Sequence, residues 1–214
     1  MKIIKPSFEI LTPIDGEAIL RYIETAARTC YKSESSNNIE STKKFIKNLI
    51  QRGHESTIEH ISTSVRISVR VICDRGISHE IVRHRLASYS QESTRYCNYS
   101  KDKFDGELIF IKPCFWGENS YLYNIWRANC KDAEWAYLML LENGATPEQA
   151  RTVLPNSLKT ELIMTMNLRE WRHFFKLRTD KAAHPQMREI AIPMLQKFKE
   201  LIPVVFDDIE VIET

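Results

Sequence analysis

Glycine is scarce in this sequence, which has six glycines among its 214 residues. None of them forms a G-x-G-x-x-G pattern or a G-x-x-x-x-G-K-[ST] loop, the motifs in which glycine lets the backbone approach a phosphate. The scarcity therefore excludes a Rossmann or Walker nucleotide site. It does not exclude a dinucleotide that is bound in another way.

Long apolar runs and paired cysteines are missing as well. No stretch approaches the roughly 18 apolar residues that a membrane span needs, and the opening MKIIKPSFEI lacks the apolar region and cleavage site of a signal peptide. The five cysteines are odd in number, scattered and without a C-x-x-C pair, which argues against a disulfide framework or a zinc ribbon. We expect a cytoplasmic protein with no membrane partner.

Charge of one sign is not in excess either. The 30 Lys and Arg residues face 28 Asp and Glu residues, so the formal net charge is +2. The chain as a whole is therefore not a binder of polyanions, and we expect no nucleic-acid partner unless a local basic patch supplies one. The length fits one domain spanning residues 1–214.

Hydrophobic periodicity predicts an α+β fold with a central mixed or antiparallel sheet flanked by helices, because helices and strands do not alternate as regular βαβ units. Asp15 and Asp74 can each cap a helix, and Ser41 precedes an amphipathic run. The expected helices are 16–31, 41–53, a short helix after Asp74, 118–141, 149–154, 168–177 and 185–201. The expected strands or extended pieces are 2–11, 62–73, 107–112, 158–166 and 203–209.

The stretch Arg83–Tyr96, RHRLASYSQESTRY, contains three arginines, a histidine, four Ser or Thr hydroxyls and two tyrosines, with almost no apolar side chains. The planar five-donor cation of arginine and the short hydroxyl of serine together suit a phosphate or a carboxylate, so we interpret the stretch as an anion-binding site. A basic helix end that runs into a solvated loop would have a similar composition. In a helix Arg83 and Arg85 would point roughly 200° apart, so either the helix ends there or the two arginines reach different ligands.

A polar cluster precedes this stretch at Gly53–His60, with the sequence GHESTIEH. Its two histidines and two glutamates match no common zinc spacing, so we expect no metal. The cluster can offer His54, Ser56 and Glu59 to a polar aromatic ligand, while Gly53 permits a close approach. Alternatively its glutamates are simply solvated.

Another polar cluster, Asn167–Arg178 with the sequence NLREWRHFFKLR, follows the last central strand that we expect. Its arginines form either an ordinary exposed face or one wall of a cleft where the sheet edge opens. The apolar side chains that we expect to be buried are Trp171, Phe174, Phe175 and Leu177.

Four blocks together resemble the flavin-dependent thymidylate synthases, the ThyX family. The first consists of Arg83, His84 and Arg85, then seven residues, then Ser93, Arg95 and Tyr96. The blocks GHESTIEH, TPEQARTVLP and NLREWRHFFKLR are similar to other family blocks, in the same order and at compatible distances. The resemblance covers the chain from about residue 52 to about residue 191.

This resemblance implies a ThyX-like fold and a homotetramer with active sites at subunit interfaces, each binding FAD, dUMP and a folate. The implied reaction is the reductive methylation of dUMP to dTMP. Methylenetetrahydrofolate would be the one-carbon donor, and FAD reduced by NADPH would be the hydride source. The small molecules dUMP and folate are thus the expected partners.

Carried over position by position, the resemblance divides the polar residues between two ligands. It implies dUMP contacts from Glu80, Arg83, Gln91, Ser93, Arg95, Arg151 and Arg178, with Arg83 and Arg178 acting in catalysis. It implies flavin contacts from His54, Ser56, Glu59, Arg83, His84, Arg85, Leu86, Asn167, Arg169 and His173.

Three positions depart from the family pattern: Ser90 stands where asparagine is usual, Glu80 where glutamine is common and Gln91 where an acid is frequent. A carboxylate of Glu80 near the dUMP phosphate would repel it unless an arginine intervenes. None of the five cysteines lies in the four blocks, so the flavin rather than a thiol would carry the reactivity. Ser93 has no evident base beside it in the sequence, which favours a phosphate contact over a nucleophile.

Two other functions stay open from the residues alone. A metal-dependent phosphohydrolase would use the His and Glu residues of 54–60 with His79 and His84 as ligands. A nucleic-acid-binding module would use the basic residues of 83–95 and would show a steep dependence on salt.

Overall fold

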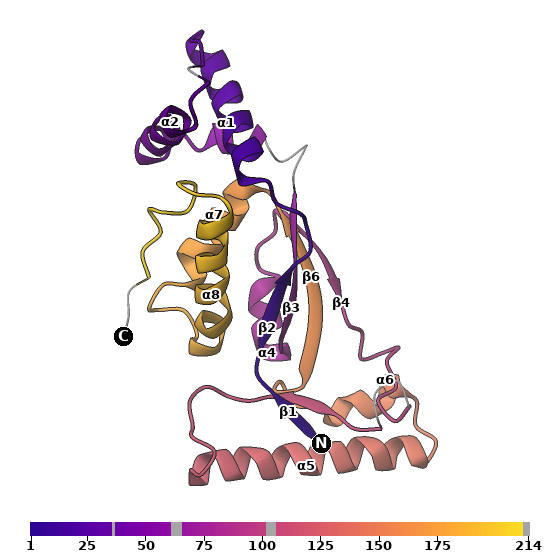
Figure 1. The fold of residues 1–214 in the computed structure, drawn as a ribbon. Helices are drawn as coiled ribbons and strands as arrows, with labels where there is room; N and C mark the ends of the chain where they lie inside the picture. Colours follow the sequence, from indigo (N-terminus) through magenta and orange to yellow (C-terminus); the bar gives the residue numbers. More distant parts are fainter. Residues whose placement is uncertain (36, 61–65, 102–105, 212–214) are drawn as a thin grey trace. The chain divides into compact units, whose positions relative to one another are not determined.

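The structure is a computed structural model that describes residues 1–35, 37–60, 66–101 and 106–211. Most of its helices and strands are labelled in Figure 1. The strands are β1 (Lys2–Ile4), β2 (Ser7–Ile10), β3 (Ile67–Asp74), β4 (Ala87–Gln91), β5 (Ile109–Ile111) and β6 (Lys159–Met166). The helices are α1 (Gly16–Tyr31), α2 (Ile39–Gln51), α3 (Ser56–Glu59), α4 (Arg75–Ile81), α5 (Tyr121–Glu142), α6 (Pro147–Ala150), the 3-10 turn η3 (Arg151–Val153), α7 (Leu168–Arg178) and α8 (Pro185–Leu201).

The strands form two small sheets. Strand β1 pairs in parallel with β5, and a four-stranded sheet has the order β2-β3-β6-β4. Ile67, Val69 and Val71 of β3 are fully buried, which confirms the predicted alternation over this part of the strand. Residues 62–65 of the predicted strand lie outside the described residues. The α+β class is confirmed.

The chain divides into two compact units, called unit 1 and unit 2 below. Unit 1 contains Met1–Ser7, Arg70–Arg83 and Tyr89–Ile163. Unit 2 contains Phe8–Val69, His84–Ser88 and Met164–Thr214. The chain passes from one unit to the other within β2, β3, β4 and β6, and between Arg83 and His84. The single domain expected over residues 1–214 stays a prediction.

Helix starts follow side chains that accept a hydrogen bond from the first turn. Asp15 accepts from Ala18 N at 3.0 Å and Asp74 from Ile77 N at 2.9 Å, as predicted for α1 and α4. The predicted start of α2 at Ser41 is wrong. Asn38 caps that helix, because its side chain accepts from the backbone N of Glu40 at 2.9 Å.

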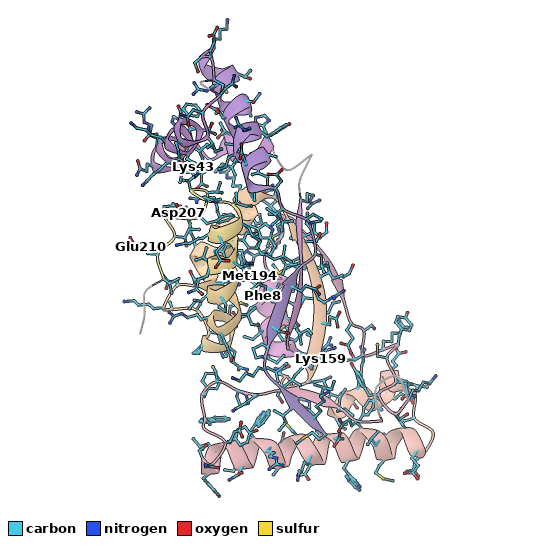
Figure 2. The ribbon with its side chains drawn as sticks, in the orientation of Figure 1. Phe8, Lys43, Lys159, Met194, Asp207 and Glu210 are labelled. Carbon is cyan, nitrogen blue, oxygen red and sulfur yellow. The ribbon has the colours of Figure 1, made fainter. Side chains whose placement is uncertain are left out.

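Aromatic rings of α7, α8 and the following segment build the core of unit 2. Helices α7 and α8 lie side by side in Figure 1, and Met194 of α8, labelled in Figure 2, is fully buried. The ring of Phe198 lies 4.8 Å from Trp171 and 5.4 Å from Phe206, centroid to centroid. The extended piece predicted over 203–209 is wrong: the segment turns instead, which buries Phe206 in this cluster.

Helix α5 supplies much of the core of unit 1. Tyr123, Cys130 and Tyr137 recur every seven residues and are buried, and the ring of Tyr137 lies 5.8 Å from Tyr99. Leu140 of the same helix is 37% exposed. Within the described ranges, no helix combines the length and apolar character that crossing a membrane requires.

Candidate active site

Helix α7 places a row of polar side chains along one face. Asn167 caps the helix by accepting a hydrogen bond from Glu170 N at 2.8 Å. Residues at positions i, i+4 and i+7 share a face of a helix, so Arg169, His173 and Lys176 point the same way. All three are exposed, whereas Trp171, on the other side, is fully buried. The aromatic face thus anchors the helix and leaves the polar row free to line a site.

A hollow of about 450 Å³ opens beside this row in unit 2. Its walls come from α7, from the segment around α3 and from the residue after Arg85. It is lined by Glu55, Glu59, Leu86, Asn167, Arg169, Glu170, His173 and Lys176. Five of these residues belong to the predicted flavin set, so three sequence blocks that lie far apart in the chain meet at one hollow.

Ion pairs organise the charges of this hollow. Arg169 Nη1 lies 2.7 Å from Glu59 Oε1, and Lys176 Nζ lies 3.2 Å from Glu55 Oε1. Burial works to raise the pKa of Glu55, but the hydrogen bond from Lys176 and the charge of Arg172 outweigh it and hold that pKa below its ordinary value. The alternative of a simply solvated glutamate is therefore wrong for Glu55, whereas Glu59 is 44% exposed in its pair with Arg169.

The arginines of this helix were expected on an exposed face or on the wall of a cleft. Arg172 differs from both expectations, because only 1% of it is exposed. Its Nη1 and Nη2 lie 2.7 and 2.8 Å from the carboxylate of Asp208, and Nη1 also donates to the carbonyl of Val205. Its Nη2 lies 3.1 Å from Glu55. A sequence signal existed: position 172 is four residues from the buried Leu168, on the apolar face of the helix.

The expected burial of Trp171, Phe174 and Phe175 is confirmed, and that of Leu177 is wrong, since Leu177 is 49% exposed. Leu177 follows Lys176 on the polar side of the helix rather than the core side. The apolar stripe of α7 is therefore narrower than the composition of the block suggested.

His84 is buried at the edge of the same group of residues, with 4% of it exposed. Its Nε2 accepts a hydrogen bond from Arg178 Nε at 3.1 Å, and its Nδ1 lies 3.4 Å from Glu170 Oε1. The ring centroid lies 5.6 Å from His173 and 5.0 Å from Phe174. Burial first, then the charges of Arg178 and His173, lower the pKa of His84 to about 4, so the imidazole is neutral at neutral pH.

The ligand atoms of His84, Glu170 and His173 all lie within 4.8 Å of one another, a separation that could suit a metal ion. The hydrogen bond from Arg178 argues against this reading. A histidine that binds a metal through one nitrogen normally donates the N-H of the other, whereas His84 Nε2 accepts from a guanidinium that can only donate. A cation at Nδ1 would therefore require a deprotonated ring beside another positive charge.

The R-H-R motif divides between the two units. Helix α4 ends at Ile81, so Arg83 and Arg85 both lie beyond the helix, and the first of the two alternatives holds. Arg83 is exposed in the turn that ends its part of unit 1, and Arg85 is exposed in unit 2. Leu86, the next residue, is 69% exposed and lines the hollow.

The remaining flavin candidates of unit 2 stand at the start of α3. His54 and Ser56 are exposed on either side of Glu55, which precedes the helix. Gly53 has φ +72°, a left-handed conformation that suits glycine, and it turns the chain into this segment. His54 and Ser56 are therefore next to the lining residue Glu55, although they do not themselves line the hollow.

Unit 1 brings two other predicted blocks together. Arg95 Nε lies 3.1 Å from Glu148 of α6, and Arg151 Nη1 lies 3.4 Å from Thr94 Oγ1. Ser93 Oγ accepts from the backbone N of Arg95 at 3.2 Å, which shapes the turn. Two exposed arginines thus flank the Ser93 turn, an arrangement that suits a phosphate.

Two other predicted dUMP contacts lie nearby in sequence but are tied into unit 1. Gln91 Nε2 lies 2.9 Å from Ser78 Oγ and 3.1 Å from Thr160 Oγ1. Glu80 is half-buried in the last turns of α4, and its carbonyl accepts from Arg83 N at 3.3 Å. The amide of Gln91 therefore holds β4 to its neighbours within the unit.

Sequence reasoning missed four polar residues of unit 2, namely Glu55, Glu170, Arg172 and Lys176. All of them occur within the two clusters GHESTIEH and NLREWRHFFKLR. The only sign of these residues in the sequence was their position beside the predicted site residues. Their ion pairs depend on how α3 and α7 meet, and hydrophobic periodicity does not specify that contact.

Comparisons with known proteins bear on this geometry. Residues 17–204 match the family described as thymidylate synthase complementing protein. A protein of Pyrococcus horikoshii named flavin-dependent thymidylate synthase is 34% identical over 208 residues, which cover 96% of this chain and 82% of that protein. The chain belongs to the flavin-dependent thymidylate synthase family.

Other members of the flavin-dependent thymidylate synthase family show similar agreement. The proteins of that name from Geobacter sulfurreducens and Mycobacterium avium are each 34% identical to this chain. The matches cover 87% and 94% of this chain, and 80% and 82% of the relatives. The chain is thus an enzyme of this family, and the comparisons do not support a metal-dependent phosphohydrolase or a nucleic-acid-binding module.

Proposed function

We propose that this chain converts dUMP to dTMP by reductive methylation, with methylenetetrahydrofolate as the one-carbon donor and NADPH-reduced FAD as the hydride source. The observation that supports the proposal most directly is the hollow of unit 2. Predicted flavin residues from three sequence blocks line this one hollow. The family membership supports the reaction class. We propose a ThyX-like fold and a cytoplasmic location as part of the same assignment.

The chemistry of the hollow fits a flavin dinucleotide. Arg169 and Lys176 would offer cations to a pyrophosphate by exchanging Glu59 and Glu55 for its oxygens, and the exposed side chain of Leu86 offers an apolar contact to a ring system. His173 adds an imidazole edge from the same helix face. The residues that would hold FAD are His54, Ser56, Glu59, Arg83, His84, Arg85, Leu86, Asn167, Arg169 and His173. When bound, the reduced flavin supplies the hydride.

The turn of unit 1 is the proposed site for the phosphate of dUMP. Arg95 and Arg151 flank Ser93, and their exposed guanidinium groups can exchange Glu148 and Thr94 for phosphate oxygens. Arg83 and Arg178 would act on the pyrimidine, where a fixed cation stabilises the charge that develops on a carbonyl oxygen. Glu80 and Gln91 would complete the dUMP contacts.

We propose a homotetramer whose sites lie at subunit interfaces. Helix α5 supports this assembly, because it carries several large apolar side chains that are mostly exposed in the single chain. Tyr121 is 78% exposed, Trp135 67% and Ile125 51%. Burial of such side chains between copies of the chain would remove apolar surface from water.

The direct test is made on the purified chain. We expect protein with flavin absorbance, or a protein that acquires it on incubation with FAD, and NADPH oxidation that is faster with dUMP than without it. With methylenetetrahydrofolate added, dTMP should appear. A colourless protein that gains no affinity for FAD on reconstitution would contradict the proposal, and so would activity that is abolished by a chelator in the absence of flavin.

A further inference from the structure

Glu170 is a polar residue of the hollow to which the family resemblance gave no role. It is 6% exposed, and it stands in the first turn of α7, where Asn167 accepts a hydrogen bond from its backbone N. A glutamate three residues after a capping residue often turns back to that residue. Here its Oε1 lies 3.4 Å from Nδ1 of His84.

The protonation of His84 follows from its neighbours. Arginine has donors and no acceptor, so the contact from Arg178 Nε at 3.1 Å requires a lone pair on His84 Nε2. A neutral imidazole with a lone pair on Nε2 carries its proton on Nδ1. Nδ1 lies 3.4 Å from the carboxyl group of Glu170, an acceptor, without the alignment of a hydrogen bond. The three groups therefore form an ordered row that runs from Glu170 through His84 to Arg178.

We propose that Glu170 is a positioning residue for Arg178, acting through His84. By offering an acceptor to Nδ1-H, Glu170 favours the tautomer and ring orientation in which Nε2 accepts from Arg178. The Nε bond then fixes the rotation of the guanidinium, and with it the direction in which the group would meet the pyrimidine. In the single chain this 3.4 Å contact does not have the geometry of a hydrogen bond, and the proposal includes its tightening when the ligand binds. The role in turnover depends on the proposed function, since it assumes that Arg178 acts on dUMP.

A structural role for Glu170 has different consequences. As the acidic residue in the first turn of α7, it also stabilises the positive end of the helix dipole. Glutamine keeps an acceptor oxygen and loses the charge, whereas leucine keeps the approximate size and loses both. The positioning role therefore predicts that Glu170→Gln retains what Glu170→Leu loses, while the dipole role predicts equal loss of stability in the two variants.

The kinetic test compares these two variants with Glu200→Gln, which removes an exposed carboxylate from α8 of the same unit. We expect Glu170→Leu to lower kcat for dUMP-dependent NADPH oxidation by about 10- to 100-fold, as for the loss of a partner that orients a functional histidine. The rates are measured at saturating FAD, because Glu170 also lines the hollow proposed for the flavin. Glu170→Gln should recover most of kcat, and Glu200→Gln should match the original chain.

A spectroscopic test does not need turnover. Nitrogen-15 NMR of the imidazole rings at neutral pH should show His84 protonated at Nδ1 in the original chain and in Glu170→Gln, and a mixture of tautomers in Glu170→Leu. If Glu170→Leu fails to fold, the original chain and Glu170→Gln still provide the comparison.

The outcomes separate the two proposals. A kcat in Glu170→Leu that equals that of the original chain would overturn the positioning role, as would a Glu170→Gln variant as impaired as Glu170→Leu, or a proton on Nε2 in the original chain. An original chain that binds FAD but shows no dUMP-dependent NADPH oxidation would instead refute the proposed function. The tautomer of His84 would then still decide whether the row exists.

Discussion

Two polar groups of unit 2, Arg172 and His84, are buried and interlocked with their partners, whereas Arg95 and Arg151 of unit 1 lie on the surface beside the Ser93 turn. Arg172 binds Asp208 and Glu55 while 1% exposed, and His84 lies between Arg178 and Glu170 while 4% exposed. In unit 1, Arg95 pairs with Glu148, and both side chains are more than half exposed.

This difference in burial means that the polar side chains of one group are held in a fixed geometry, whereas those of the other group can exchange their partners. A buried charge must keep its partners, because losing one leaves an uncompensated ion in a region of low dielectric constant. An exposed ion pair contributes little, so either member can change partners at small cost. We infer that unit 2 fixes the orientation of its ligand in advance, whereas unit 1 supplies arginines that become ordered when an anion arrives.

The largest effect should come from the most buried charge. Arg172→Leu removes the cation that joins α7 to Glu55 and Asp208, and we expect the unfolding free energy to fall by about 3 kcal/mol, near the low end for buried pairs because both carboxylates keep some access to water. Urea denaturation of the flavin-free chain measures it. Lys176→Met, which removes a cation that is 47% exposed, should change it by less than about 1 kcal/mol. Equal losses in the two variants would contradict the comparison.

Arg178 tests whether the buried row serves the reaction. Arg178→Ala should lower dUMP-dependent NADPH oxidation by about 100-fold, the loss typical when one donor to a developing charge is removed. Bound flavin should be retained, because Arg178 is not among the residues that line the hollow. The absorbance of the purified variant and its steady-state rates give both quantities. If Arg178→Ala loses bound flavin as well as activity, Arg178 contacts the flavin rather than dUMP.

Mild acid should weaken unit 2 through His84. The pKa of His84 is lowered to about 4 by burial and by its cationic neighbours, whereas an unfolded histidine titrates near ~6.5. Between these values the unfolded chain binds more protons, so the unfolding free energy should fall as the pH is lowered from about 6.5 to about 4. His84→Asn should reduce this slope in urea titrations, whereas the exposed His79→Asn should retain it. The same slope in both variants would assign the acid sensitivity to other groups.

Local signals in the sequence predicted the boundaries of some elements, whereas strand β4 and helix α3 were not predicted. Helices α1 and α8 begin and end where expected, because Asp15 caps one and Pro185 occupies the first turn of the other. The final segment was mispredicted because Phe206 packs against rings that are distant in the sequence. Its turn is decided by tertiary contact, which local propensity does not contain.

The sequence predicted which residues belong to the site, but it did not predict the hydrogen bonds and ion pairs between them. The family resemblance named Asn167, Arg169 and His173, which do line one hollow. It did not reveal the burial of Arg172 or the turn of Glu170 toward His84, because these depend on which side chains α7 meets across the unit. Periodicity specifies the face of a helix on which a residue lies, and the partner on that face comes from the fold.

A smaller effect is expected at the surface of unit 1. Arg95→Ala should raise the dUMP concentration needed for half-maximal NADPH oxidation by about tenfold, which corresponds to the loss of about 1.5 kcal/mol from one charge-assisted hydrogen bond. Flavin content and unfolding free energy should stay close to those of the original chain, since 53% of the Arg95 side chain is exposed. Arg127→Ala, on an exposed position of α5, is the matched control. A destabilised Arg95→Ala variant would mean that the unit 1 turn is as pre-formed as unit 2.

The smallest effect has the opposite sign. Glu148 holds Arg95 in the absence of dUMP, and Glu148→Gln removes the charge that the phosphate must displace. An exposed pair of this kind contributes between about 0.2 and 1 kcal/mol, so the variant should need up to about fivefold less dUMP for half-maximal activity. The double variant Arg95→Ala with Glu148→Gln should gain nothing over Arg95→Ala, because the competition disappears with the arginine. If Glu148→Gln instead weakens dUMP binding, Glu148 orients Arg95 for the ligand, and the arginines of unit 1 are held in advance in the manner of His84 and Arg178.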